Sequence, residues 1–369
     1  MIEHVDDLVA HGALDCIKIL DHAARGPLAF DRASYRNLET IGMAVHTGTL
    51  ALVVREHVSR LEAEGLSYLH GTGVAFAERS RVALRINREE LVIAAVVGEV
   101  APMVVNAGLY DVGFEGEPQI LPATGGITPN VRVGDSAFGF RADHIEPAVT
   151  IRNPDDRANT ALNTLACIGN EAVVTSGDAK GARGRVTGKH GGVEHVMVDF
   201  SPDVMRSMAI GDRVQVWSCG LGMLIIDAPA VKVFNADPDL LDACGAEAHE
   251  GRLSIAVSRI VPAAVMGSGL GRSTVVRGDY DVQTFDDELA RAHGLREIRL
   301  GDIIAIKDAD NSFGRIYRTG ALTVGVVVHG RSFIAGHGPG VTTLLTSPAG
   351  NIDVSVDERA NLATILKLR

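Results

Sequence analysis

The chain has few cysteines, few aromatic residues and fewer basic than acidic residues. The four cysteines show no C-x-x-C spacing, which excludes a zinc knuckle and a redox pair. They are Cys16, Cys167, Cys219 and Cys244. With a net charge of −11, the chain lacks the clustered Lys and Arg that nucleic acid or an anionic membrane surface requires. We therefore expect a small-molecule substrate, and no nucleic-acid or membrane partner.

The sequence also lacks targeting and membrane-spanning signals. Its first residues, Met1 to Asp7, have no basic region followed by an apolar one. No apolar run reaches the roughly 18 residues of a membrane span. These features predict a cytoplasmic protein whose cysteines stay reduced.

What the sequence has is a large apolar content and many glycines. Apolar residues make up 46% of the 369 residues, enough to bury a full core, and 41 residues are glycine. The beginning of the chain has helical periodicity, and short β-branched runs dominate after it. We predict an α+β fold, mainly β, with small SH3-like or other β-barrel units and a helical N-terminal extension. The predicted segments are the extension at 1–85, a β-rich domain with one helix at 86–170, a small barrel at 171–235 and a C-terminal β-rich domain at 236–369.

Three segments repeat one short pattern, an apolar residue followed by Gly-Asp. They are Val133-Gly134-Asp135, Ile210-Gly211-Asp212 and Leu300-Gly301-Asp302. Glycine supplies the positive φ of a tight turn, and the aspartate can bond the backbone beyond it. The pattern predicts turns that lead into strands. Two helices are predicted among the strands, at 154–166 with Asn153 as N-cap and at 286–293.

Familiar nucleotide and calcium motifs fail on their spacing. The glycines of Met266 to Gly271 read G-x-G-x-G and are followed by Ser-Thr-Val-Val instead of a helix, which excludes a dinucleotide-binding turn. Lys189 is followed by His190 where a P-loop needs Ser or Thr, and Thr319 stands where a calcium loop needs Glu. We therefore expect no nucleotide cofactor.

A divalent metal ion is the cofactor that the C-terminal third suggests. Acids, an amide and imidazoles follow apolar strands there, beside a glycine-rich loop, and such groups are the usual ligands of divalent cations. The predicted metal ligands are Asp308, Asp310, Asn311, His329 and His337. The alternative is an Asx-rich turn with a hydrogen-bonded histidine beside a tight loop.

Catalytic candidates stand in two other glycine-framed segments. Lys180, Lys189 and His190 could bring a base and a cation to a substrate, although a solvated pair of hairpins explains the same residues. If 143–146 is extended, His144 and Glu146 face one way and act together; the alternative is a turn that ends at Pro147.

Backbone nests in the glycine loops are predicted to bind a ligand. The residues concerned are Gly267, Ser268, Gly269, Gly338 and Gly340. Successive N–H groups in such loops form concavities that hold anions.

The segment from about Val92 to Gly340 contains long ordered blocks: GDSAFGF, ADHIEP, GNEAVVTSGDAKGARGRVTGKHGG, MGSGLG, GDYD, GDIIAIKDADNSFG, GVVVHG and GHGPGV. On these blocks the chain resembles a family of bacterial and archaeal proteins known only as a domain of unknown function, one member of which is a structural-genomics target from a thermophilic bacterium. The resemblance implies a mostly β architecture with a small barrel, and a homo-oligomer. It implies no activity, and the helical first eighty residues look like an addition to the common core.

Two functions follow from these residues. The first is a metal-dependent hydrolase of a small polar metabolite, such as a cyclic amide or another C–N bond. In it the acids with His329 or His337 hold the cation, His190 is the base, and Lys180 or Lys189 stabilises negative charge. The alternative is a non-catalytic homo-oligomer that binds an anionic metabolite in the glycine loops.

Overall fold

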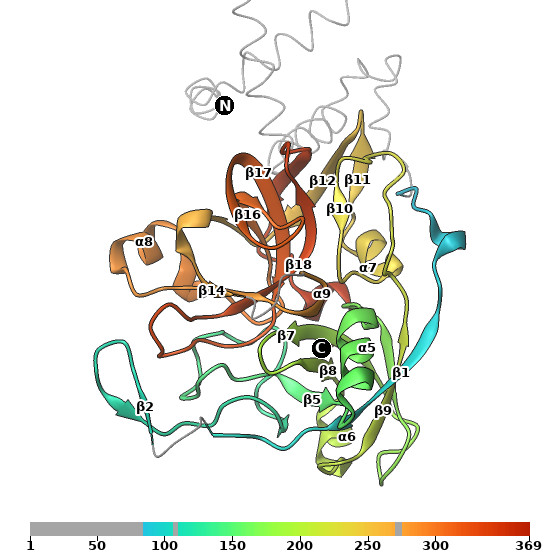
Figure 1. The fold of residues 1–369 in the computed structure, drawn as a ribbon, viewed down its shortest axis with the longest axis vertical. Helices are drawn as coiled ribbons and strands as arrows, with labels where there is room; N and C mark the ends of the chain where they lie inside the picture. Colours follow the sequence, from blue (N-terminus) through green and yellow to red (C-terminus); the bar gives the residue numbers. More distant parts are fainter. Residues whose placement is uncertain (1–83, 106–109, 270–274) are drawn as a thin grey trace, which may run out of the picture. The chain divides into compact units, whose positions relative to one another are not determined.

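The computed structural model describes residues 84–105, 110–269 and 275–369 (Figure 1). The predicted helical extension therefore lies almost entirely outside the described residues. Within the described part, none of the helices has the length and apolar character needed to cross a membrane. The prediction of a mainly β fold with barrel units is confirmed.

The first half of the described chain is a closed six-stranded antiparallel barrel. Its strands, in order around the barrel, are β1 (Ala94–Val100), β9 (Arg213–Ser218), β6 (Glu171–Val174), β7 (Arg183–His190), β8 (His195–Asp199) and β5 (Ala148–Arg152), with β4 (Ile127–Thr128) beside β5. Pairing of β1 with β5 closes the barrel, which leaves the six strands with little unpaired edge. Apolar side chains such as Val96, Ile151 and Val216 fill it. The strands of the barrel come from both 86–170 and 171–235. The barrel therefore joins two segments that were predicted to be separate domains.

A second sheet forms the C-terminal half. Its strands run in the order β13 (Arg259–Pro262), β16 (Ile303–Asp310), β17 (Ile316–Val327), β18 (Gly340–Ser347), β15 (Tyr280–Val282) and β14 (Met266–Gly269), and β10 (Lys232–Val233) also pairs with β18. In Figure 1 the orange and red strands of this sheet adjoin the green strands of the barrel. Gly188 of β7 allows the close approach, because a Cβ there would lie 2.6 Å from Val328.

Shorter elements complete the part of the chain that the structure describes. The remaining strands are the pair β2 (Asp111–Val112) and β3 (Pro118–Gln119), and the sheet of β11 (Glu247–His249), β12 (Arg252–Val257) and β19 (Ile352–Val356). The α-helices are α5 (Asp156–Leu165), α6 (Pro202–Ser207), α7 (Pro238–Ala243), α8 (Asp287–Ala292) and α9 (Leu362–Ile365). The 3-10 turns are η1 (Arg88–Glu90), η2 (Ala263–Val265), η3 (Val275–Arg277) and η4 (Leu295–Glu297).

Both predicted helices are present, but one has a different cap. The N-cap of α5 is Asp155, whose carboxylate accepts from the Ala158 N–H, and the Asn153 side chain instead accepts from the Asp155 N–H. Asn153 thus orders the turn before the helix, and the N-cap lies two residues later than predicted. Helix α8 begins after Asp286, which caps it through the Leu289 N–H.

The three Gly-Asp turns share one geometry. Their glycines have φ of +98°, +89° and +81° in chain order. Each aspartate accepts a 2.8 Å hydrogen bond from the N–H three residues before it, at Arg132, Ala209 and Arg299 respectively. The prediction that each aspartate bonds the backbone after the turn is therefore wrong, because its carboxylate bonds the backbone before the turn. Strands β9 and β16 begin directly after two of these aspartates.

Burial should decide how much each Gly-Asp turn stabilises the fold. Asp302 is buried and also accepts from the side chains of Arg299 and Asn361, whereas the Asp135 side chain is 27% exposed. We predict that Asp302→Ala lowers the free energy of unfolding by about 1–3 kcal/mol, because it leaves buried donors unpaired, and that Asp135→Ala lowers it by less. Urea unfolding of both variants measures the difference. Equal losses of unfolding free energy in the two variants would show that burial does not determine how much each aspartate stabilises the fold.

Candidate metal centre

Six ligand-type side chains meet where the barrel adjoins the second sheet. Two come from the barrel half, from the loop before β5 and the end of β7. Four come from β15 and its preceding residue, the end of β17 and the loop before β18. The six, called the His/Asp centre below, are His144, His190, Asp279, Asp281, His329 and His337.

Glu146 organises the barrel side of the centre. Its buried carboxylate lies 2.6 Å from His190 Nδ1 and 3.1 Å from His195 Nδ1, two residues that face each other across β7 and β8. The Gly125 N–H and the Thr150 hydroxyl also donate to it, each at 2.7 Å. Burial alone would raise the pKa of Glu146, but His195 and His190 outweigh it and hold the pKa well below its usual value.

This carboxylate fixes the orientation of His190. An Nδ1–H that donates to Glu146 leaves the Nε2 lone pair free for another ligand. Burial, together with the charge of nearby His329, lowers the pKa of His190, which favours the neutral imidazole that binds metals.

His144 and His329 are oriented in the same way. His144 Nδ1 lies 2.8 Å from Asp143, and His329 Nδ1 lies 2.9 Å from the Gly330 carbonyl oxygen, so Nε2 of each ring faces the other side chains of the centre. His144 also has a φ of +52°, held by a hydrogen bond from its N–H to the Arg331 carbonyl. A non-glycine residue in this region costs free energy, and such residues cluster at functional sites.

The two aspartates flank Tyr280 in β15. A spacing of two along an extended chain puts both carboxylates on one side of the strand. Asp279 Oδ2 lies 2.7 Å from His329 Nε2, and Asp281 Oδ2 lies 2.9 Å from His337 Nδ1. These acids are not among the ligands predicted from the sequence, although Gly278-Asp279-Tyr280-Asp281 contains the signal in its alternating carboxylates.

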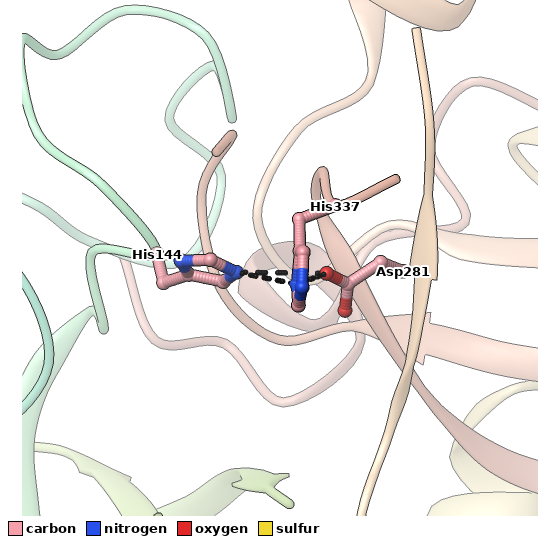
Figure 2. Close-up of side chains that lie close together, drawn as sticks. All are labelled: His144, Asp281 and His337. Carbon is pink, nitrogen blue, oxygen red and sulfur yellow. Dashed lines mark hydrogen bonds and ion pairs between the residues drawn. The ribbon is translucent and has the colours of Figure 1, made fainter. Parts of the chain in front are cut away.

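The six side chains form two groups, each with two histidines and one aspartate. We call His190, Asp279 and His329 the inner group, because all three are buried, and His144, Asp281 and His337 the outer group. Figure 2 shows the outer group, with the His337 ring between His144 and Asp281. His144 Nε2 lies 3.1 Å from His337 Nδ1 and 3.6 Å from Asp281 Oδ2.

Charge interactions between the aspartates and the histidines connect the two groups. Burial would raise the pKa of Asp281, but its contacts with His144, His329 and His337 lower it. Burial would lower the pKa of His329, but the Asp279 carboxylate outweighs it and raises the pKa well above the usual value. The buried acids thus demand positive charge, which a proton or a divalent cation can supply.

The donor set fits a transition metal. Imidazole and carboxylate together suit zinc, iron, manganese, cobalt or nickel, whereas magnesium and calcium favour oxygen ligands alone. Hydrogen-bonded imidazoles of the kind seen at His144, His190 and His329 are typical of metal ligands.

The structure brings four predicted site residues together: His144, His190, His329 and His337. Their partners differ from the prediction, however. Glu146 contacts His190 and His195, while His144 contacts Asp143. The positive φ of His144 breaks the extended alternation on which a His144–Glu146 pair depended.

Asp308, Asp310 and Asn311 do not join these histidines. In the antiparallel pairing of β16 with β17, Asp310 lies opposite Ile316, whereas His329 follows the other end of β17. The strand between these ends spans roughly 30 Å. The three side chains have other partners as well: Asp308 accepts from the Gly320 N–H, Asp310 from the Ser312 N–H, and Asn311 donates to Thr343. The grouping predicted from sequence is therefore wrong for these three.

The two lysines predicted to be catalytic are not among the six residues of the His/Asp centre. Lys180 is exposed in the turn after β6. Lys189 is buried and donates to the Asn235 side chain and the Val276 carbonyl at 2.8 and 2.9 Å. Burial lowers the pKa of Lys189 to about 8. Its two oxygen partners indicate that it links the barrel to the neighbouring segments.

The glycine loops allow close packing of the backbone. A Cβ on Gly267 would lie 2.1 Å from the Gly336 carbonyl oxygen, and one on Gly338 would lie 2.0 Å from that of Val282. The Gly338 N–H points to Asp281 at 3.2 Å, so it binds the protein's own carboxylate. Gly269 and the backbone of Ser268 belong to β14, and the Ser268 side chain is outside the described residues. Gly340 directly borders the inner group.

Loss of the Glu146 charge should weaken metal binding. We predict that Glu146→Gln lowers the affinity for zinc by roughly 10–100-fold, because His190 loses the anion that orients it. Competition with a chromophoric chelator measures the affinity. The matched control is Asp199→Asn, which removes another buried carboxylate, paired with Arg132, and should leave the affinity unchanged. An equal effect in both variants would contradict the role of Glu146.

Comparison with known proteins identifies a family and a solved structure whose descriptions name no activity. Residues 110–242 match the N-terminal domain, and residues 243–366 the C-terminal domain, of a family described as domain of unknown function DUF4438. A solved structure titled "Crystal structure of TM1086" is 44% identical, with a TM-score of 0.73, over 76% of this chain and 98% of that chain. No curated protein matches. The chain belongs to the DUF4438 family.

Proposed function

We propose that this protein is a divalent-metal-dependent hydrolase that acts on a small polar metabolite. The observation that carries the proposal is the convergence of four imidazoles and two carboxylates in the His/Asp centre. Three of the imidazoles have Nδ1 engaged by an oxygen, as metal ligands do.

The chemistry of such a centre suits hydrolysis. A bound divalent ion lowers the pKa of a coordinated water and polarises a carbonyl oxygen. For a cyclic amide, the water oxygen bonds to the carbonyl carbon, the C–N bond breaks and the leaving nitrogen takes a proton. The reaction needs no oxidant or reductant. In this proposal His190 is a ligand, with Nδ1 committed to Glu146, and is not the general base expected from sequence.

The substrate would reach the centre from the outer group. His337 has 35% of its side chain exposed and His144 has 15%, whereas His329 is fully buried. A small molecule can therefore approach the outer histidines from solvent. Binding of an anionic metabolite in the glycine loops has less support, because the Gly338 N–H is already occupied by Asp281.

Metal removal should abolish hydrolysis. We predict that the purified chain opens cyclic amides in a panel of lactams, imides and linear amides, that chelation stops turnover, and that zinc, manganese or cobalt restores it. Asp281→Asn should lower kcat by at least about 100-fold, since it removes a ligand. Asp310→Asn is the matched control, because that acid lies at the far end of β16.

Two results would contradict the proposal. One is a chain that binds no divalent metal after exposure to these ions. The other is turnover that survives complete chelation. Binding of an anionic metabolite without turnover would instead favour the non-catalytic oligomer.

A further inference from the structure

The centre contains more donors than one ion requires. We propose that it binds two cations, one in the inner group and one in the outer group, bridged by the Asp281 carboxylate. The inference deepens the proposed function and rests on it for its catalytic consequence, whereas the number of ions can be measured without any substrate.

The outer group has the separations expected around a single ion. Donors bound at about 2.1 Å lie about 3.0 Å apart at a right angle and about 3.4 Å apart at the tetrahedral angle. The three separations among His144 Nε2, His337 Nδ1 and Asp281 Oδ2 are 2.9, 3.1 and 3.6 Å. One cation can therefore contact all three atoms with little movement.

The inner group contains two atoms that lack a hydrogen bond. Asp279 Oδ2 and His329 Nε2 are buried and form an ion pair at 2.7 Å, and neither atom has a hydrogen-bond partner among the described residues. Buried polar atoms are rarely left unsatisfied. A cation that both atoms contact satisfies them, and His190, stacked on His329 with ring centres 4.1 Å apart, is the third donor.

The backbone at Gly340 packs directly against these two atoms. A Cβ on Gly340 would lie 2.0 Å from Asp279 Oδ2 and 2.1 Å from His329 Nε2. Both distances are far shorter than van der Waals contact, so any side chain at this position would displace the two donors.

Asp281 connects the groups through its two oxygens. Oδ2 lies 2.9 Å from His337 Nδ1 in the outer group, while Oδ1 lies 3.7 Å from His329 Nε2 in the inner group. A carboxylate that presents one oxygen to each side can bridge two ions about 3.5–4 Å apart, the spacing of two-metal hydrolytic sites. A single ion would use only one of these two directions.

Burial makes the two positions unequal. The inner ligands are 0–9% exposed, whereas His337 of the outer group is 35% exposed. We therefore expect the inner ion to exchange slowly and the outer ion to exchange quickly and to contact the substrate.

Metal counting tests the proposal. The full chain is stripped with a chelator, loaded with cobalt or zinc, freed of excess ion, and measured by mass spectrometry. Wild type should hold two ions per chain and lose them to a chelator in separate fast and slow phases. His337→Ala should hold one ion, lost in the slow phase. That variant changes a partly exposed residue, so folding is expected to survive.

Gly340→Ala tests the inner position without removing a ligand. Its methyl group should eliminate the slow phase and one ion per chain. Gly139→Ala is the control, because a Cβ there makes only ordinary contacts of 3.5 Å or more, and it should keep both ions. Circular dichroism checks that each variant is folded. If Gly340→Ala does not fold, the number of ions bound by the wild type and by His337→Ala decides between one ion and two.

One ion per chain in the wild type would overturn the two-ion centre. Equal loss from both phases in His337→Ala would also overturn it, since the positions would not be distinct. A one-ion chain that still hydrolyses its substrate in a metal-dependent way leaves the proposed function intact. A chain that binds two ions but hydrolyses no substrate would contradict the proposed function and support the two-ion centre.

Discussion

The buried carboxylate of Glu146 is the interaction on which the rest of the site depends. It comes from the loop before β5 and receives hydrogen bonds from Thr150 in β5, His190 in β7 and His195 in β8. Removing such a charge from water is costly, and several aligned donors are needed to offset the cost. The same contacts that make the charge tolerable hold three barrel strands in register and aim His190 at Asp279 and His329.

Buried polar contacts also fix the barrel to the second sheet. The Thr342 hydroxyl of β18 donates to the Lys189 carbonyl, and Lys189 Nζ donates to Asn235 beside β10. Gly188 removes the side chain that would keep β7 away from Val328. Ligands carried by rigid strands keep their geometry better than ligands on loops. His190 of β7 and Asp281 of β15 are thus carried by two sheets that cannot easily slide past each other.

Features that depend on neighbouring residues could be predicted from the sequence. Features that depend on how distant strands pair could not. The Gly-Asp turns and helix α8 depend on a few neighbouring residues, so their positions could be predicted. Three histidines could be named because glycines adjoin them, and His144 because acids adjoin it, but their partners could not. Asp308 and Asp310 resemble ligands as well as Asp279 does, and only the register of β16 on β17 separates them from His329. That register depends on contacts between distant segments.

The division of ligands between the two halves of the chain has a consequence for how such proteins can evolve. Residues up to 242 supply one histidine to each group, His190 to the inner and His144 to the outer. Residues from 243 onward supply one aspartate and one histidine to each. Neither family domain alone carries a complete set, so the two cannot be exchanged with unrelated partners as independent modules. Gene fission or domain shuffling at this boundary would separate every ligand set at once, and selection on the centre would keep the pair together.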